Sequence, residues 1–390
     1  MNAYSETWLR RGFPWVYRDE IIRASRPFAP GEAALIRSSS GAVLGVGLAD
    51  EGKIALRRFR EDEGPVDGAL LRERLSAALA RRRVPADTTA WRWLNAENDD
   101  MPGMRLDVWG EHLTVTLDAP GLLVLREPLV ETCKDLFHAA VPGGALRAVH
   151  LSWRLAGAEP GEALPRGRVW GAPGPDEVEV RELGLRLRVR PADGFDAGIY
   201  CDMRELRAWM APWWRGRRVL NTFAFTGAFS VSAAVHGARE VLSVDLSGAA
   251  LGRLEENLRL NGVDPDLHPR WDMDVFRALD RLRRKEERFD VVIADPPSFA
   301  HGPDGLWTAA RDFPRLVAAC LRVLEPGGWL IAATNNGAVS PKAFQEQVQD
   351  GALRAGRRLR LLHQGSPPPD FPAALHFPES RYLKAWVLEA

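Results

Sequence analysis

The sequence has few cysteines, no net charge and no long apolar run, and each absence excludes a class of protein. Its three cysteines, Cys133, Cys201 and Cys320, are far apart and lack zinc-ligand spacing, so we expect no disulfide framework, no metal site and a reducing compartment. Lysine plus arginine equals aspartate plus glutamate at 52 each, which excludes a general attraction to polyanions. No signal peptide and no apolar span of about 20 residues is present, so we expect a cytoplasmic protein without a membrane partner.

Two phosphate-binding patterns are also missing, although residues 219–247 have the order strand, turn, helix, strand. The first apolar run ends at Asn221 and the second ends at Asp245. The turn between them contains Phe223, Thr226 and Gly227. An acid at the tip of such a strand accepts hydrogen bonds from ribose hydroxyls. Neither Gly-x-Gly-x-x-Gly nor Gly-Lys-Ser/Thr occurs here, which favours a nucleoside ligand without phosphate, such as S-adenosylmethionine (SAM). An ordinary α/β repeat is the alternative.

A second motif follows the apolar run 290–294. It reads Asp295-Pro296-Pro297-Ser298-Phe299. The prolines cannot continue a strand ladder, so they stiffen the loop and direct the carboxylate of Asp295 into the crevice at the end of the sheet. Many class I methyltransferases place such a loop beside the transferred methyl group. A plain turn after the strand is the other interpretation.

The rest of the chain divides into three predicted domains. Residues 1–70 are predicted to form a small β-barrel, residues 71–178 a central α+β domain, and residues 179–390 the catalytic α/β domain. The segment 157–175 is rich in proline and glycine and is expected to be an exposed linker. Five arginines favour a basic face for RNA on the barrel, and the nearby acids 61–63 (EDE) equally favour a solvated mixture of charges. The arginines are Arg10, Arg11, Arg57, Arg58 and Arg60.

Six motifs in order along nearly the whole chain resemble the class I SAM-dependent methyltransferases of large-subunit ribosomal RNA. They are residues 14–17 (PWVY), 97–103 (ENDDMPG), 198–204 (GIYCDMR), 221–227 (NTFAFTG), 295–299 (DPPSF) and 377–384 (FPESRYLK). The resemblance implies a PUA-like β-barrel, a central domain and a Rossmann-like catalytic domain. It also implies SAM as cofactor, ribosomal RNA or an assembling particle as partner, and a homodimer.

Carried over to this sequence, the resemblance implies a set of cofactor-binding residues. They are Tyr200, Asp202, Arg204, Asn221, Phe223, Thr226, Gly227, Asp245, Asp274 and Asp295. In this assignment Asp245 binds the ribose, Asp274 lies near the adenine, and Asp295 lies near the methyl sulfonium and the target base. Local pattern alone also allows Asp202 to cap the helix that begins at Arg204, and Asp274 to cap a helix of its own.

The sequence departs from part of that family at the acceptor side. Methylation of cytosine C5 needs a thiolate to attack C6 first, and relatives with this activity carry a Cys where this chain has Asn335. Residues 335–336 (NN), 196–198 (DAG) and 298–300 (SFA) resemble instead the branch of the family that methylates guanine N7. This resemblance implies guanine N7 as the acceptor, whose lone pair needs positioning and little acid–base help. The predicted catalytic residues are Asp295, Pro296, Pro297 and Asn335. Asn335 and Asn336 either bind a flipped base or simply form a turn.

Two other functions remain open at this point. The fold of the catalytic domain does not by itself determine which molecule accepts the methyl group, so methylation of a protein or a small molecule is one alternative. A ribosome assembly factor that binds SAM and RNA without turnover is the other, and the missing Cys motivates it. Methyl incorporation separates the three functions.

Overall fold

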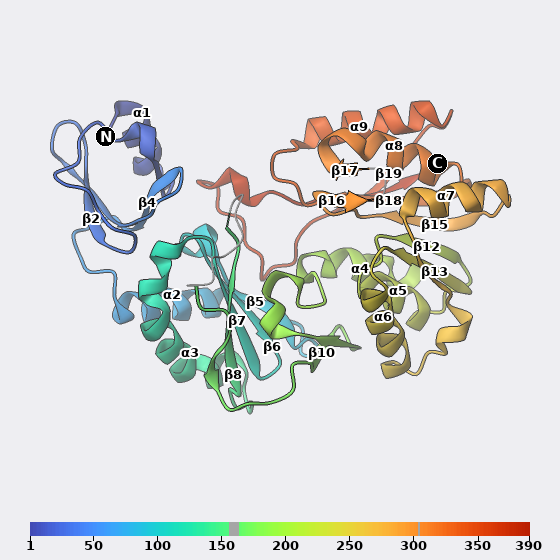
Figure 1. Cartoon of the computed structure of the whole chain (residues 1–390), viewed down its shortest axis with the longest axis horizontal. Coiled ribbons are helices and arrows are strands. Elements are labelled where there is room, and N and C mark those ends of the chain that lie inside the picture. Colours follow the sequence, from blue (N-terminus) through green and yellow to red (C-terminus); the bar gives the residue numbers. More distant parts are fainter. Residues whose placement is uncertain (156–163, 303–304) are drawn as a thin grey trace. The chain divides into compact units, whose positions relative to one another are not determined.

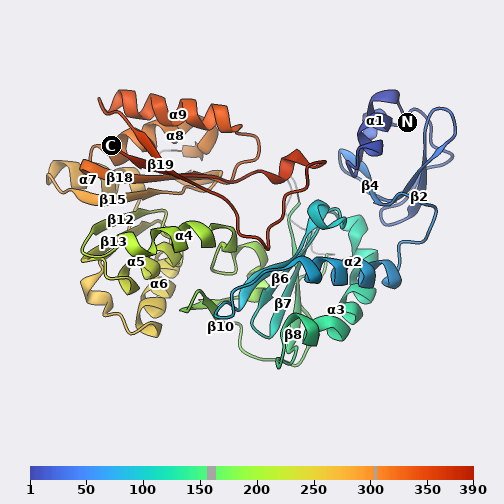
Figure 2. The same cartoon turned by 180° about the vertical axis from the view of Figure 1, so that it is seen from behind.

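The computed structural model describes residues 1–155, 164–302 and 305–390 (Figures 1 and 2). Contacts divide the chain into two compact units. The first comprises Met1–Val180, Val189–Ala197 and Pro369–Ser380, and the second comprises Arg181–Arg188, Gly198–Pro368 and Arg381–Ala390. No helix within the described ranges is long and apolar enough to cross a bilayer.

The first unit begins with a helix and a four-stranded antiparallel sheet, in the strand order β1-β4-β3-β2. The elements are α1 (Ala3–Arg10), β1 (Trp15–Tyr17), β2 (Ala33–Arg37), β3 (Val43–Ala49) and β4 (Ile54–Arg60). Burial along β2 alternates between exposed and buried residues, as expected for a strand with one face on a core. That small core contains Leu9, Val16, Ile36 and Leu44.

The central part of the first unit packs two helices on a five-stranded sheet, in the strand order β5-β6-β7-β8-β9. The strands are β5 (Ala90–Asn95), β6 (Met104–Trp109), β7 (His112–Leu117), β8 (Ala148–Trp153) and β9 (Gly167–Gly171). The helices are α2 (Gly68–Arg81) and α3 (Arg126–Ala140). The leucines of α2 at successive turns, among them Leu71 and Leu75, are fully buried in this core, as their spacing predicts.

The expected linker 157–175 is partly wrong. Its residues 167–171 form β9, which pairs antiparallel with β8. Gly167 and Gly171 are the end residues of this strand and are themselves paired with residues of β8, so these glycines do not mark a connecting loop. Residues 157–163 of this segment lie outside the described residues.

A hairpin leads to the second unit and is formed by β10 (Val178–Glu182) and β11 (Leu185–Val189). The second unit itself contains a seven-stranded sheet in the order β14-β13-β12-β15-β18-β20-β19. Its strands are β12 (Arg218–Thr222), β13 (Glu240–Asp245), β14 (Arg270–Asp272), β15 (Phe289–Ala294), β18 (Leu324–Thr334), β19 (Arg360–Gly365) and β20 (Lys384–Glu389). β20 runs antiparallel to both of its neighbours, β18 and β19, whereas the pairings among β14, β13, β12, β15 and β18 are parallel.

Helices cover both faces of this sheet (Figure 1). They are α4 (Arg204–Met210), α5 (Ala228–Val235), α6 (Gly248–Leu260), α7 (Val275–Arg284), α8 (Ala309–Leu321) and α9 (Pro341–Arg354). Side chains alternate along each strand: Leu220 and Val292 pack in one core with α7, α8 and α9, whereas Val219 and Val291 pack in the other with α4 and α5. Such a sheet must be apolar on both faces, which explains the continuous apolar runs in the sequence.

Parallel strand order reverses at β12, whose two neighbours are β13 and β15. In open α/β sheets, a crevice for ligands forms at the carboxyl ends of strands where the order reverses. The predicted cofactor turn follows β12, and the Asp-Pro-Pro loop follows β15. A short hairpin not expected from the sequence comes next, formed by β16 (Phe299–Gly302) and β17 (Gly305–Thr308).

Candidate active site

The turn after β12 holds its backbone in a conformation that residues with side chains rarely adopt. Phe223 has φ of +56° and Phe225 has φ of +50°, both in the left-handed region. The backbone N–H of Phe225 donates a hydrogen bond to Asp245 Oδ2 at 2.8 Å. Gly227 has φ of +82°, and a Cβ there would collide with the side chain of Leu254. Strain of this kind is typical of ligand sites, where the surrounding structure maintains it.

Asp245 lies at the last position of β13, beside this turn. Its Oδ2 accepts from Phe225 and its Oδ1 accepts from the backbone N–H of Ser247 at 2.9 Å. Each carboxylate oxygen has further lone-pair capacity after these bonds, so the fixed carboxylate is suited to a pair of vicinal hydroxyls. Its predicted role as the ribose acid stays a prediction.

A second loop, residues 198–203, faces the turn and is anchored by a buried ion pair. Arg207 donates to both carboxylate oxygens of Glu182, at 2.6 and 2.7 Å, and the two side chains are almost completely buried. Arg207 also donates to the backbone carbonyl of Tyr200 at 2.9 Å. The ring of Tyr200 lies 5.6 Å from that of Phe225 on the opposite loop, measured between centroids. Arg207 and Glu182 were not among the residues predicted for the site.

A cavity lies between the turn and this loop, at the carboxyl ends of β12 and β15. Its lining residues are Gly198, Ile199, Tyr200, Met203, Arg207, Asn221, Phe223, Ala224, Phe225, Thr226, Ala228, Phe229 and Asp295. The predicted cofactor residues that the cavity brings together are Tyr200, Asn221, Phe223, Thr226 and Asp295. Aromatic rings beside a carboxylate suit a ligand that has an adenine ring and a sulfonium cation, so the residues fit SAM.

Two of these lining residues also have structural roles. Asn221 donates from Nδ2 to Ser230 Oγ at 2.8 Å, which ties β12 to α5. The hydroxyl of Thr226 donates to the carbonyl of Gly198, so the turn and the facing loop are joined directly.

Asp202 does not cap α4, and that alternative is wrong. The N-cap position of α4 is Met203, where no side-chain bond is formed. Asp202 instead accepts a hydrogen bond at 2.7 Å from the hydroxyl of Tyr382, which is 180 positions away in the chain. The loop is thus attached to the carboxyl-terminal segment.

The remaining predicted cofactor residues lie outside the lining of the cavity. Arg204 is fully buried on α4, and Arg207, one helical turn further, reaches the cavity in its place. Asp274 caps α7, because its Oδ1 accepts from the backbone N–H of Arg277 at 3.0 Å. The helix-cap alternative for Asp274 is therefore confirmed, and its contact with adenine stays a prediction.

Asp295 follows directly after β15 and is one of the residues that line the cavity. Burial, and then the neighbouring carboxylate of Asp202, raise the pKa of Asp295 to about 7, and the Arg207 guanidinium opposes this increase. The next two residues hold the loop: Pro296 is buried, and the carbonyl of Pro297 accepts from Trp307 Nε1 at 3.1 Å. Trp307 belongs to β17, so the short hairpin braces the Asp-Pro-Pro loop.

The two asparagines after β18 have different roles. Asn336 Oδ1 accepts from the backbone N–H of Ala338 at 3.0 Å, which makes Asn336 part of a turn. Asn335 Oδ1 accepts from Ser298 Oγ at 3.0 Å and so connects this turn to the Asp-Pro-Pro loop. Within the part of the chain that the structure describes, the Asn335 amide nitrogen has no hydrogen-bond partner. The turn alternative is confirmed for Asn336, while Asn335 is still able to donate to a ligand.

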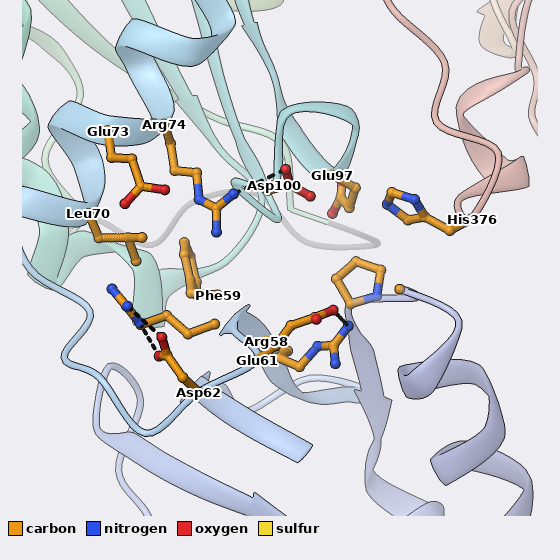
Figure 3. A pocket seen from close by; sticks show the side chains of 13 residues that line it. Arg58, Phe59, Glu61, Asp62, Leu70, Glu73, Arg74, Glu97, Asp100 and His376 are labelled. Carbon is orange, nitrogen blue, oxygen red and sulfur yellow. Dashed lines mark hydrogen bonds and ion pairs between the residues drawn. The ribbon is translucent and has the colours of Figure 1, made fainter. Parts of the chain in front are cut away.

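The first unit has a separate cavity of about 650 Å³ (Figure 3). Three arginines line it, and each is paired with an acid that is more exposed than the arginine. The pairs are Arg58–Glu61 at 3.2 Å, Arg60–Asp62 at 2.5 Å and Arg74–Asp100 at 3.2 Å. Elsewhere in this unit Arg57 pairs with Asp50 and Arg10 with Glu6. The charge mixture on the amino-terminal domain is therefore largely self-neutralised, which weakens the idea of a basic face there.

The described residues contain no group of three or more His, Cys, Asp or Glu side chains that could hold a metal ion. With a doubly wound sheet in the order β14-β13-β12-β15-β18-β20-β19 and a nucleoside-type site at the carboxyl ends of its strands, the second unit defines a class I methyltransferase.

The comparisons with known proteins define the family more closely. Residues 168–385, more than half of the chain, match the S-adenosylmethionine-dependent methyltransferase family, and residues 2–61 match the PUA-like domain. The chain belongs to this family of SAM-dependent methyltransferases, and SAM is its cofactor. A Deinococcus radiodurans protein named ribosomal RNA large subunit methyltransferase is 34% identical, with 100% of this chain and 96% of the relative covered.

A second relative, ribosomal RNA large subunit methyltransferase I of Tolumonas auensis, is 31% identical over 99% of this chain and 97% of its own. Among solved structures, a protein complexed with S-adenosylhomocysteine has a TM-score of 0.88 at 23% identity, covering 100% of this chain and 98% of that chain. A Streptococcus mutans protein has a TM-score of 0.86 at 22% identity with the same coverage. These two structures confirm the fold.

Proposed function

We propose that this enzyme transfers a methyl group from SAM to a base of large-subunit ribosomal RNA, and that the acceptor atom is guanine N7. The RNA substrate is supported by relatives at 34% and 31% identity that are named for this activity and match over nearly their whole length. The acceptor atom is supported by the environment of Asn335, which is the observation that carries the proposal.

A cytosine C5 acceptor would need a thiolate near the methyl group. The three cysteines are buried and none belongs to the turn after β18. Burial raises the pKa of the Cys133 and Cys320 thiols far above the usual value, so neither forms a thiolate near neutral pH. Cys201 is buried in the loop before α4 and is not among the described residues that line the cavity. The chain therefore offers no suitable nucleophile for C5.

The Asn335 amide presents the hydrogen-bonding pattern that guanine requires. Its oxygen already accepts from Ser298 Oγ, whereas its N–H groups form no hydrogen bond within the described residues, so the amide is able to donate to a base. On its major-groove edge guanine presents two acceptors, O6 and N7, whereas cytosine presents an amino donor on the same edge. A donor held on O6 would orient the adjacent N7 lone pair without competing for it.

Methyl transfer to N7 needs few further catalytic groups from the protein. SAM supplies an electrophilic methyl group on a sulfonium sulfur. N7 attacks with an existing lone pair, so no side chain has to remove a proton, and rate enhancement comes from positioning the two partners. In this proposal Asp295 balances the positive charge that the methylated base acquires, and Pro296 and Pro297 keep the loop rigid.

The test is to incubate the enzyme with tritiated SAM and unmodified large-subunit RNA, digest the RNA to nucleosides and identify the labelled one. Label in 7-methylguanosine is the expected result, with Cys201→Ala retaining activity and Asn335→Ala losing at least tenfold. Label in 5-methylcytidine that disappears in Cys201→Ala would overturn the N7 assignment. No label in RNA while SAM still binds would overturn the RNA substrate, and label in a protein or small acceptor would identify the alternative.

A further inference from the structure

The carboxyl-terminal strand places a buried lysine directly behind the acceptor turn. Lys384 is the first residue of β20 and pairs with Thr334, the last residue of β18. The lysine is only 4% exposed. Its ammonium group donates to the backbone carbonyl of Asn336 at 2.7 Å and to that of Tyr382 at 2.5 Å.

This ammonium has an unusual environment. Within residues 1–155, 164–302 and 305–390, no carboxylate forms an ion pair with Lys384, and its two acceptors are neutral carbonyls. Burial lowers the pKa of Lys384 to about 8, so holding the charge here costs free energy. An apolar side chain of similar length would fill the same space without that cost, so packing alone does not explain the lysine.

The contacts of Lys384 connect both halves of the site. Through the Asn336 carbonyl the ammonium fixes the turn whose preceding residue, Asn335, accepts from Ser298 on the Asp-Pro-Pro loop. Through the Tyr382 carbonyl it fixes a residue whose hydroxyl donates to Asp202 on the cofactor loop. One cation thus holds the backbone on the acceptor side and on the cofactor side.

We propose that Lys384 is a positioning residue for methyl transfer: its ammonium holds the turn that carries Asn335, so that the Asn335 amide faces the acceptor base. This inference rests on the proposed base methylation, and it assigns a role to a side chain that touches neither substrate. A displacement of about 1 Å at a reacting centre can cost about a hundredfold in rate. Loss of the two hydrogen bonds should therefore reduce the rate of transfer far more than it reduces cofactor binding.

The test compares Lys384→Met, which keeps the length without charge or donors, with Lys384→Gln, which keeps one neutral donor. Single-turnover methyl transfer to the wild-type acceptor, SAM affinity by calorimetry and the unfolding midpoint are measured for each. We expect a loss of rate of about a hundredfold in Lys384→Met, a smaller loss in Lys384→Gln, and SAM affinity within about twofold of wild type in both. Equal loss of SAM affinity and rate, or an unchanged rate, would refute the positioning role.

A double-mutant cycle keeps the proposal testable if Lys384→Met does not fold. If Lys384 acts through Asn335, adding Lys384→Gln to Asn335→Ala should slow transfer by less than about twofold beyond Asn335→Ala alone. If the double variant instead loses rate by the product of the two single losses, Lys384 does not act through Asn335. Because each variant is compared with wild type on whichever acceptor wild type methylates, failure here is distinct from failure of the RNA assignment.

Discussion

Replacing Asp295 with asparagine should stabilise the enzyme without ligands while impairing its function. The pKa of this carboxyl group is raised from 3.8 to about 7, mainly by burial. A carboxyl group with a raised pKa in the folded state binds its proton more tightly there, so its contribution to stability is present below pH 3.8 and is lost as pH rises through about 7. At pH 8 the folded enzyme therefore bears the full cost of a charged Asp295.

The magnitude follows from the shift. A pKa raised by roughly 3, at about 1.36 kcal/mol for each pKa unit, gives an upper limit of ~4 kcal/mol for the cost of the charged carboxylate. Because the residue is only partly buried, solvent screening reduces this, and we expect about 2 kcal/mol. The carboxylate makes no hydrogen bond within the part of the chain that the structure describes, so an isosteric amide leaves no former partner unsatisfied. Asp295→Asn should thus raise the free energy of unfolding by about 2 kcal/mol at pH 8 and by little at pH 4.

The assay is urea unfolding at both pH values, following the transition that bound SAM shifts, since this transition reports on the catalytic unit. The exposed Asp266 gives a matched control, because Asp266→Asn changes the same chemical group on the surface of the same unit. Calorimetry should show weaker SAM binding by Asp295→Asn, by about tenfold if one charge contact with the sulfonium is lost. A variant less stable than wild type at pH 8, or a gain that does not depend on pH, would refute the reasoning.

Other buried or strained groups give three further tests. Glu182→Gln leaves the buried Arg207 guanidinium unpaired and should lower the free energy of unfolding by about 3–5 kcal/mol, and adding Arg207→Met should recover part of this in urea unfolding. Burial lowers the pKa of His150, which lies 3.3 Å from His112, from 6.5 to about 4. The free energy of unfolding should therefore decrease as the pH falls from 6.5 to 4. His150→Gln should remove about 1–2 kcal/mol of that loss in calorimetric scans. Phe225→Gly relieves a positive φ but removes a ring from the cavity, so we expect an unchanged unfolding midpoint and about tenfold weaker SAM binding by titration.

Patterns that repeat locally could be predicted from the sequence. The apolar runs of β12, β13 and β15, the turn at Phe223 to Gly227 and the Asp-Pro-Pro loop all follow from neighbouring residues, and the structure places them at the same edge of one sheet. Asp274 illustrates the limit of such patterns. An acid after a short strand is equally suited to a ligand and to a helix cap, and here the cap is formed.

Residues that depend on distant segments could not be found in this way. Arg207 meets Glu182 across 25 positions, and Tyr382 meets Asp202 across 180. No local periodicity encodes such pairs, because their partners are set by the packing of the sheet and its helices. The strand β9 was missed for a related reason: its glycines have the composition of a loop, and only pairing with β8 makes the segment a strand.

The distribution of charge around the cavity connects these observations. Methyl transfer to N7 moves one positive charge from the sulfonium to the base and releases no proton, so the charge within the site is conserved and only its position changes. The carboxylate of Asp202 disfavours ionisation of Asp295, an effect that a bound cation would relieve. Cofactor binding should therefore lower the pKa of Asp295, and the rate of transfer at saturating SAM should stay level from pH 7 to 8. Transfer to cytosine C5 would instead require a proton acceptor. A transfer rate that does not change from pH 7 to 8, together with label in 7-methylguanosine, would thus support a mechanism in which the site positions the two reactants and transfers no proton.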